Sequence, residues 1–278
     1  MKYLFFKCGL LLALIGCSHH SEQQLTPEAI IEELTKTGFE QSWPAASTRM
    51  QQDHPTPADC FKAIFLAGRL HKKEESKRFL LKGFAVTEKS DPMYAELLIY
   101  RSQQHVDNQD YVRAAKDLDS ALAINPKSIV ALQNLGYIAA ISNENELAVS
   151  YSLRLLEVAP GDSGALVNLS YSCGELGMYS DAIKYAKQGL AKVKEEQMRA
   201  SLLNNMGYSM GMSGDMEKGM QHIDSSLRLR PENPYAWCNK GILLLKQDKK
   251  GLACEAFRMA KDKGGLNMTE HYIRQYCQ

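Results

Sequence analysis

The fold of this chain is decided by the stretch Ile129–Asp162, which reads IVALQNLGYIAAISNENELAVSYSLRLLEVAPGD. Polar residues at Asn143–Asn145 mark a turn between two stretches that suit helices. Gly136 and Ala148 are small residues, which two antiparallel helices need where they cross closely. Pro160 ends the second helix because proline cannot continue the hydrogen-bond ladder. The stretch therefore predicts a helical hairpin.

The same pattern returns along the chain with a constant period, which is the length of the stretch just quoted. Two residue types share this period, a proline after each hairpin and a glycine within it, and together they predict a repeat protein. The markers are Pro92, Pro126, Pro160 and Pro231, with Gly68, Gly136, Gly207 and Gly241. The interval from Pro160 to Pro231 is slightly longer than two periods. We place the three extra residues around Lys192–Arg199, in the second helix of the fourth unit or its loop, or else at a kink.

Six units follow when the glycine is set at the eighth position of each. They span residues 61–94, 95–128, 129–162, 163–199, 200–233 and 234–266. Each resembles the tetratricopeptide-repeat (TPR) pattern, with a large residue at position four and a small one at position twenty, such as Leu132 and Ala148. The first unit fits least well, because Leu80 holds its small position. This resemblance implies an all-α, right-handed α-solenoid of about six helix-turn-helix repeats.

Two further segments flank the predicted repeats. Residues 27–60 are expected to form a short amphipathic helix at Pro27–Thr37, opened by Thr26, and then a loop at Gln41–Pro57. Residues 267–278 are expected to form a final helix, Asn267–Tyr276, because the last hydrophobic face of a solenoid needs a cap.

The N-terminus predicts export and lipid attachment. Residues 1–16, MKYLFFKCGLLLALIG, combine early lysines with a short apolar core, as in a signal peptide. The junction Leu14–Cys17 resembles the bacterial lipobox, which implies acylation of Cys17 and cleavage before it. Residues 17–26 would then be a flexible tether, and Ser18 favours an outer-membrane destination facing the periplasm. The alternative is an ordinary signal peptide with an incidental cysteine.

The C-terminal cysteines carry a second expectation. The stretch from Ala253 to Cys277 looks like the ending of many bacterial TPR proteins that have a cysteine in each of the last two helices. That likeness implies that Cys254 and Cys277 lie side by side and form a disulfide in an oxidising compartment. Buried free thiols are the alternative.

The candidate binding surface follows from the TPR resemblance. In that family, positions six and nine of the first helices line a concave groove. An asparagine amide both donates and accepts, so a ladder of asparagines could hold a peptide backbone, while tyrosines add apolar area with a polar tip. Since asparagine before Leu-Gly is also close to the family consensus, inheritance is the alternative. The residues are Asn134, Asn168, Asn205 and Asn239, with Tyr137, Tyr171 and Tyr208.

Composition and motifs argue against other functions. The 33 basic and 32 acidic residues become 31 and 32 once Lys2 and Lys7 are removed with the signal, so a nucleic-acid partner is not expected. The adjacent His19 and His20 lack a third ligand, so no metal site is predicted. The basic residues that clamp carboxylates in some TPR domains are confined here to the first unit.

No phosphate-binding loop or catalytic constellation is present, and we expect no enzymatic activity, cofactor or small-molecule substrate. The prediction is a scaffold or adaptor that binds a protein or peptide partner. A self-associating structural lipoprotein without a peptide ligand is the alternative.

Overall fold

The computed structural model describes residues 26–264 and 267–277, and these residues form fifteen α-helices and no strand. The predicted signal peptide, Cys17 and nearly all of the predicted tether lie outside the described residues. The helices are α1 (Pro27–Thr37), α2 (Phe39–Arg49), α3 (Pro57–Arg69), α4 (Lys73–Val86), α5 (Pro92–Asp107), α6 (Tyr111–Ile124), α7 (Ile129–Ile141), α8 (Asn145–Val158), α9 (Ser163–Glu175), α10 (Tyr179–Lys192), α11 (Glu196–Met212), α12 (Met216–Leu229), α13 (Pro234–Lys246), α14 (Lys250–Gly264) and α15 (Asn267–Tyr276).

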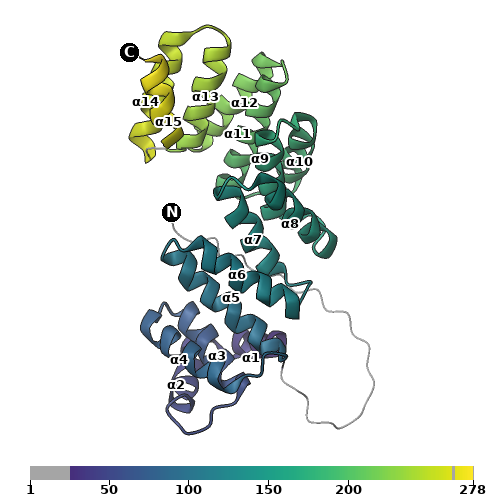
Figure 1. Cartoon of the computed structure of the whole chain (residues 1–278), viewed down its shortest axis with the longest axis vertical. Helices are drawn as coiled ribbons and strands as arrows, with labels where there is room; N and C mark the ends of the chain where they lie inside the picture. The colour runs from purple at the N-terminus through teal and green to yellow at the C-terminus, as the bar shows by residue number, and fades with distance from the viewer. Residues whose placement is uncertain (1–25, 265–266, 278) are drawn as a thin grey trace.

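Six antiparallel helix pairs, from α3/α4 to α13/α14, stack on one another into an elongated, curved solenoid (Figure 1). The pair α1/α2 precedes the stack and α15 closes it. Each pair contacts the next along the chain, so the faces between neighbouring pairs are buried. The prediction of an all-α solenoid of about six helix-turn-helix repeats is confirmed.

The turn inside each hairpin uses one residue in the left-handed region. That residue has φ between 57° and 111° in all six repeats. Glycine and asparagine adopt this conformation most readily, and three of the six turn residues are of these two types. The six residues are His71, Gln109, Asn143, Gly177, Gly214 and Asp248.

These turns correct the predicted start of the first repeat. Gln109, Asn143 and Gly177 follow one another at the regular period, but His71 precedes Gln109 by one period and about one helical turn more. The first repeat therefore begins at Pro57, where Thr56 starts a capping box, and not at residue 61.

Gly68 is thus one helical turn beyond the position at which the helices of a hairpin cross. A Cβ on Gly68 would meet only the Tyr100 ring at 3.6 Å, which is an ordinary contact. By contrast, a Cβ on Gly136 would lie 3.1 Å from Ser152 Oγ of the paired helix. Gly68 therefore resembles the crossing glycine in sequence without having its role.

Residues 41–49 are helical, so the predicted loop at Gln41–Pro57 is wrong over this part. Helix α2 buries Ser42 and Ala46, and Met50 follows directly at its end, so residues four apart face the core. Pro44 lies inside the helix and cannot donate to the carbonyl of Glu40. Both residues are exposed, so water can replace the missing hydrogen bond.

The three extra residues of the fourth unit lengthen neither α10 nor its loop. Helix α10 has 14 residues, as does α8. Instead α11 has 17 residues against 13 in α9, while the connection before α11 is one residue shorter than the one before α9. The first helix of the fifth repeat is therefore extended at its N-terminus.

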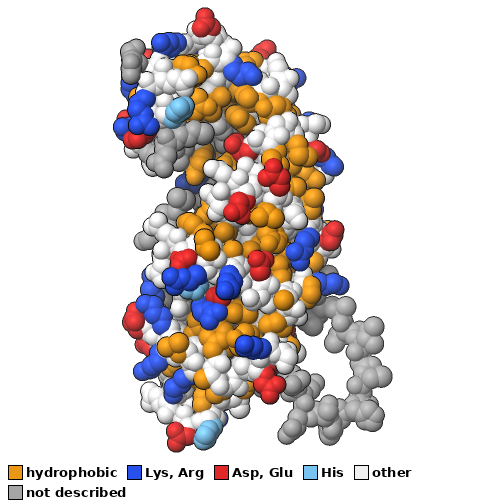
Figure 2. Space-filling model, viewed as in Figure 1, with side chains coloured by type: hydrophobic (Ala, Val, Ile, Leu, Met, Phe, Trp, Pro, Cys, Tyr) orange, Lys and Arg blue, Asp and Glu red, His pale blue; other side chains and the backbone are white. Residues whose placement is uncertain are grey.

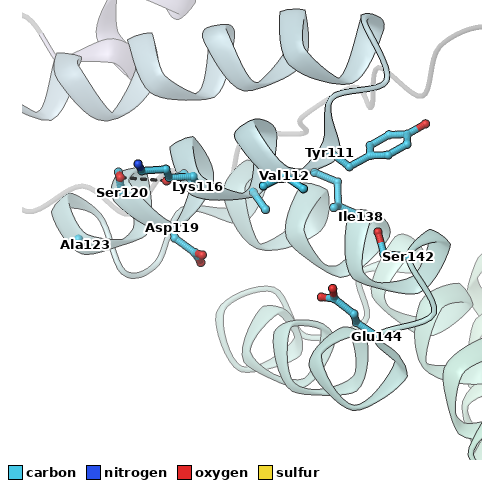
Figure 3. Close-up of a pocket in the computed structure, with 10 residues that line it drawn as sticks. Tyr111, Val112, Lys116, Asp119, Ser120, Ala123, Ile138, Ser142 and Glu144 are labelled. Carbon is cyan, nitrogen blue, oxygen red and sulfur yellow. Dashed lines mark hydrogen bonds between the residues drawn. The ribbon is translucent and has the colours of Figure 1, made fainter.

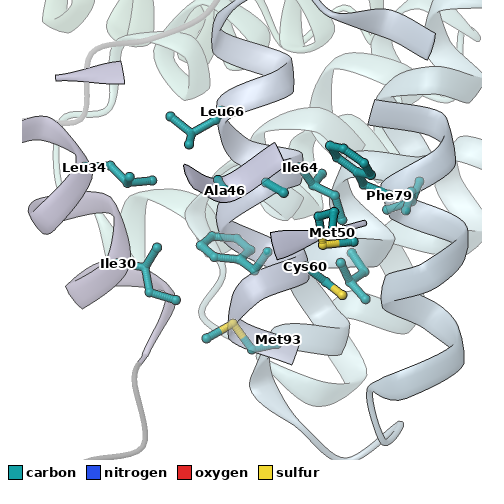
Figure 4. Packing of buried hydrophobic residues seen from close by; sticks show 13 residues of the cluster. Ile30, Leu34, Ala46, Met50, Cys60, Ile64, Leu66, Phe79 and Met93 are labelled. Atoms are coloured by element: carbon teal, nitrogen blue, oxygen red, sulfur yellow. The ribbon is translucent and has the colours of Figure 1, made fainter. Parts of the chain in front are cut away.

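The core runs as a chain of hydrophobic clusters along the solenoid. At the N-terminal end, Ile30 and Leu34 of α1 pack with Phe61 of α3 and Phe79 of α4, each no more than 2% exposed (Figure 4). At the other end, Tyr272 of α15 stacks on Phe257 of α14 with ring centroids 4.8 Å apart. These contacts cap the two ends.

The structure joins Cys254 and Cys277 in a disulfide that ties α14 to the residue after α15. Three other cysteines in the described part of the chain, Cys60, Cys173 and Cys238, are free and buried. Burial raises the pKa of each of these thiols to about 11, so they stay protonated at neutral pH.

Candidate functional site: the concave groove

The candidate site is formed by the first helices of the last four repeats. Helices α7, α9, α11 and α13 contact one another in sequence. On α7, Val130, Asn134, Tyr137 and Ile141 are spaced by three or four positions and therefore share one face. We call this face, with its counterparts on α9, α11 and α13, the groove.

The three predicted tyrosines differ in exposure along the groove. Tyr137 is 46% exposed, whereas Tyr171 and Tyr208 are half-buried. Burial, and then the charge of Glu175, raise the pKa of Tyr171 to about 12, and the same two causes raise the pKa of Tyr208. All three hydroxyls are therefore protonated at neutral pH and can donate hydrogen bonds.

Tyr235 belongs to the same surface, although it was not among the predicted groove residues. It is 44% exposed on α13. After burial and a larger contribution from Tyr111 or Glu175, it also adds to the raised pKa of Tyr137 and of Tyr171. The signal that could have found it is the second position of the repeat, where Val130 on α7 is also exposed.

The predicted asparagine ladder is wrong for Asn205. Asn205 is 7% exposed, and its amide donates to Ser170 Oγ of the preceding repeat at 2.9 Å. Its Oδ1 accepts from Asn204 at 3.3 Å, and Asn204 Oδ1 accepts from Asn239 at 3.1 Å. These bonds link α9, α11 and α13, so Asn205 connects repeats and its amide is already used.

Asn134 and Asn168 remain half-buried in the groove. A Cβ placed on Gly136 would lie 3.3 Å from Nδ2 of Asn168, so Asn168 packs against the bare backbone of the preceding repeat. No side-chain hydrogen bond of either asparagine is present within residues 26–264 and 267–277. Both amides therefore keep their hydrogen-bonding capacity for a ligand, and their role in binding stays a prediction.

Glu175 is the acidic residue of the groove, and no pattern in the sequence indicated it. It lies on α9 one turn after Tyr171. The surrounding protein partly desolvates its carboxylate, which raises its pKa, although the side chain is reached by water. The described part of the chain contains no ion pair of Glu175.

The N-terminal end of the concave side is filled by the chain itself. Helix α1 contacts α3 and α5, the first helices of repeats one and two. Lys62 of α3 pairs with Glu33 of α1 at 2.7 Å. Burial, and then the charge of Glu28 of α1, raise the pKa of Glu96 on α5 to about 7. The open groove therefore begins at α7.

Two basic residues of the first repeat pack on aromatic rings of the N-terminal hairpin. The guanidinium of Arg69 lies 5.0 Å from the Phe39 ring centroid, and the ammonium of Lys72 lies 5.1 Å from that of Trp43. Both rings belong to α2, so these cations pack on the N-terminal hairpin. Acidic and basic side chains are interspersed on the face shown in Figure 2.

Two surface hollows lie away from the groove. One, of about 600 Å³, lies between α6 and the turn of the next hairpin and is lined by Val112, Asp119, Ser142 and Glu144 (Figure 3). The other occupies the equivalent place between α12 and the turn after α13. The two hollows occupy equivalent places in two repeats, but different side chains line them. They therefore result from the stacking of the helices and do not form a specific binding site.

The described residues hold neither a membrane span nor a metal cluster. No helix there combines the length and apolarity that crossing a membrane requires. Nor do His, Cys, Asp and Glu side chains gather there in a group of three or more that could hold a metal ion.

Comparison with known proteins agrees with the architecture. No family model matches the chain. Protein FlbA of Caulobacter vibrioides is 30% identical over 150 residues, which is 53% of this chain and 25% of FlbA. The chain thus spans about a quarter of the length of that relative.

Two solved structures share the fold. The APC/C hetero-tetramer Cut9–Hcn1 superposes with a TM-score of 0.65 at 12% identity, over 92% of this chain and 49% of that chain. PilW, a type IV pilus biogenesis factor, gives 0.53 at 18% identity, over 62% of this chain and 78% of that one. With the repeat pattern and the six stacked hairpins, these similarities show that the chain has the fold of a TPR solenoid.

Proposed function

We propose that this chain is a non-catalytic adaptor that holds a segment of another protein in the groove of its last four repeats, anchored by a lipid at Cys17. The binding surface and the anchor rest on separate observations. Each therefore has its own test.

The observation that carries the binding function is the exposed apolar face of α7. Val130, Tyr137 and Ile141 share this face and are 42%, 46% and 41% exposed. The opposite side of α7 is buried in the core, where Leu132 is fully covered. A helix that is apolar on all sides is expected where each side meets a protein surface. A partner segment that lies along the groove would cover the exposed side.

The relatives support an assembly role at the level of fold. PilW is a pilus biogenesis factor, and Cut9–Hcn1 is a hetero-tetramer. At 18% and 12% identity these likenesses concern the fold alone. The shared fold is compatible with a scaffold that holds proteins together, as we propose for this chain.

Site-specific photo-crosslinking in intact cells tests the groove. A photoreactive phenylalanine at Tyr137 is expected to capture the partner. The same group at Val112, which is 83% exposed on α6, is the matched control outside the groove. Capture from Val112 and not from Tyr137 would place the interface on the convex face and contradict the proposal.

The lipid anchor rests on the apolar core of residues 1–16 and on Leu14–Cys17. We propose acylation of Cys17 and an outer-membrane location facing the periplasm. Cys17→Ser is expected to prevent incorporation of labelled palmitate and to release the protein from the membrane fraction. Labelling that persists in this variant would refute the anchor without affecting the groove.

Self-association is the competing account of the exposed face of α7. Light scattering on protein lacking residues 1–17 separates the two. A monomer agrees with a groove kept open for a partner. A dimer that Tyr137→Ser disrupts would mean that a second copy covers the face.

A further inference from the structure

The C-terminal half of the groove combines one carboxylate with several tyrosines. Tyr171 and Glu175 lie four positions apart on α9 and share a face. A Cβ placed on Gly174, the neighbour of Glu175, would lie 3.8 Å from Cδ1 of Tyr208 on α11. The ring of Tyr208 is therefore held close to the backbone that carries Glu175.

The charge of Glu175 acts on both of these tyrosines. After burial, Glu175 is the largest contributor to the raised pKa of Tyr171 and of Tyr208. This agrees with the position of the two side chains beside Glu175 in the groove.

The charge of Glu175 is not neutralised within the described protein. Lys240 of α13 is already paired with Asp224 at 2.7 Å. Glu175 holds the thirteenth position of its repeat. Among the last four repeats, the other charged residue at this position is Lys246, which is exposed at the end of α13. A partly desolvated carboxylate gains most from a cation that can also lie against aromatic faces.

We propose that Glu175, Tyr171 and Tyr208 form a receptor for a cationic side chain, arginine or lysine, of the partner segment. The apolar side chains of that segment would lie toward α7, against Val130, Tyr137 and Ile141. This inference rests on the proposed function, since it specifies what the same groove binds. It predicts a partner segment with a basic residue at one end and apolar residues at the other.

The test compares two capped tripeptides, acetyl-Leu-Arg-Leu-amide and the same peptide with citrulline, which has the shape of arginine without its charge. Binding is followed by ¹⁹F NMR of protein labelled with 3-fluorotyrosine, with signals assigned through single Tyr→Phe variants. The arginine peptide is expected to shift the signals of Tyr171 and Tyr208 and to bind about tenfold more tightly than the citrulline peptide. Equal binding, or no shift up to the solubility limit, would overturn the proposal.

Two variants separate charge from shape. Glu175→Gln is expected to remove the preference for arginine, and Glu175→Asp to retain much of it. Glu157→Gln, on the exposed face of α8, is the matched control and is expected to leave the preference unchanged. If Glu157→Gln weakens arginine binding as much as Glu175→Gln does, the attraction is general electrostatics and the receptor is refuted.

The outcome is distinguishable from failure of the proposed function. Photo-crosslinking at Tyr137 reports partner capture whatever the side chain at position 175. Capture without an arginine preference overturns the receptor alone. An arginine preference without capture leaves the receptor in place and removes the adaptor function.

Discussion

Replacing Asn205 with alanine tests how the repeats are held together. The change removes the hydrogen bond to Ser170 Oγ at 2.9 Å and the acceptor of the Asn204 amide at 3.3 Å. It leaves the Asn204 amide, on a residue only 4% exposed, without that acceptor. A neutral hydrogen bond contributes about 1 kcal/mol net, and an unsatisfied buried donor costs about 1–3 kcal/mol. We therefore expect Asn205→Ala to lower the free energy of unfolding by about 2 kcal/mol.

Urea unfolding followed by circular dichroism at 222 nm measures this loss. Asn134→Ala is the matched control, because Asn134 is half-buried on the equivalent face and has no side-chain hydrogen bond among the described residues. It is expected to cost less than about 0.5 kcal/mol. Equal unfolding midpoints for the two variants would refute the reasoning and restore Asn205 as a free member of the ladder.

Three further predictions concern packing, pH and the disulfide. Gly207→Ala should lower the free energy of unfolding, measured by thermal unfolding, by about 3 kcal/mol or more, because its Cβ would lie 2.7 Å from the Gly219 carbonyl oxygen. Gly251→Ala is the control: a Cβ there would have no atom within 4 Å, so this variant should be neutral or slightly stabilising. The pKa of Glu96 is about 7 in the native state and about 4.5 in the unfolded state. Between these pH values the native state binds more protons than the unfolded state, so the free energy of unfolding should fall as the pH rises. The protection factors of amide hydrogen exchange in α1, which are corrected for the intrinsic pH dependence of exchange, should therefore fall over that window, and Glu96→Gln should remove this fall. Denatured, unreduced protein lacking residues 1–17 should show three free thiols, Cys60, Cys173 and Cys238, and five would exclude the Cys254–Cys277 bridge.

The repeat architecture was predictable because its markers are local. A proline after a hairpin or a small residue at a crossing acts through sterics that depend on the hairpin alone. The first repeat was misplaced because Gly68 resembles the crossing glycine but makes no close contact. Helix α2 was missed because Pro44 argues for a loop, and only its exposed position makes the helix tolerable.

The candidate site was predictable in place but not in detail. Position in the repeat placed the tyrosines on the concave side, yet it could not distinguish the buried Asn205 from the half-buried Asn168. That distinction depends on Ser170 and Asn204, which belong to other positions and, for Ser170, to another repeat. Tyr235 joins the surface from the second position of its repeat, which is not one of the two positions that the TPR resemblance assigns to the groove.

The central claim is that the open groove, beginning at α7, is the binding surface. Its most direct test is the affinity of the partner captured from Tyr137, measured by isothermal titration calorimetry on two single variants. Tyr137→Ser should weaken binding at least about tenfold, because it removes an exposed aromatic contact, whereas Val112→Ser should leave the affinity unchanged. Equal affinities for Tyr137→Ser and the unmodified chain, or a loss confined to Val112→Ser, would contradict the account.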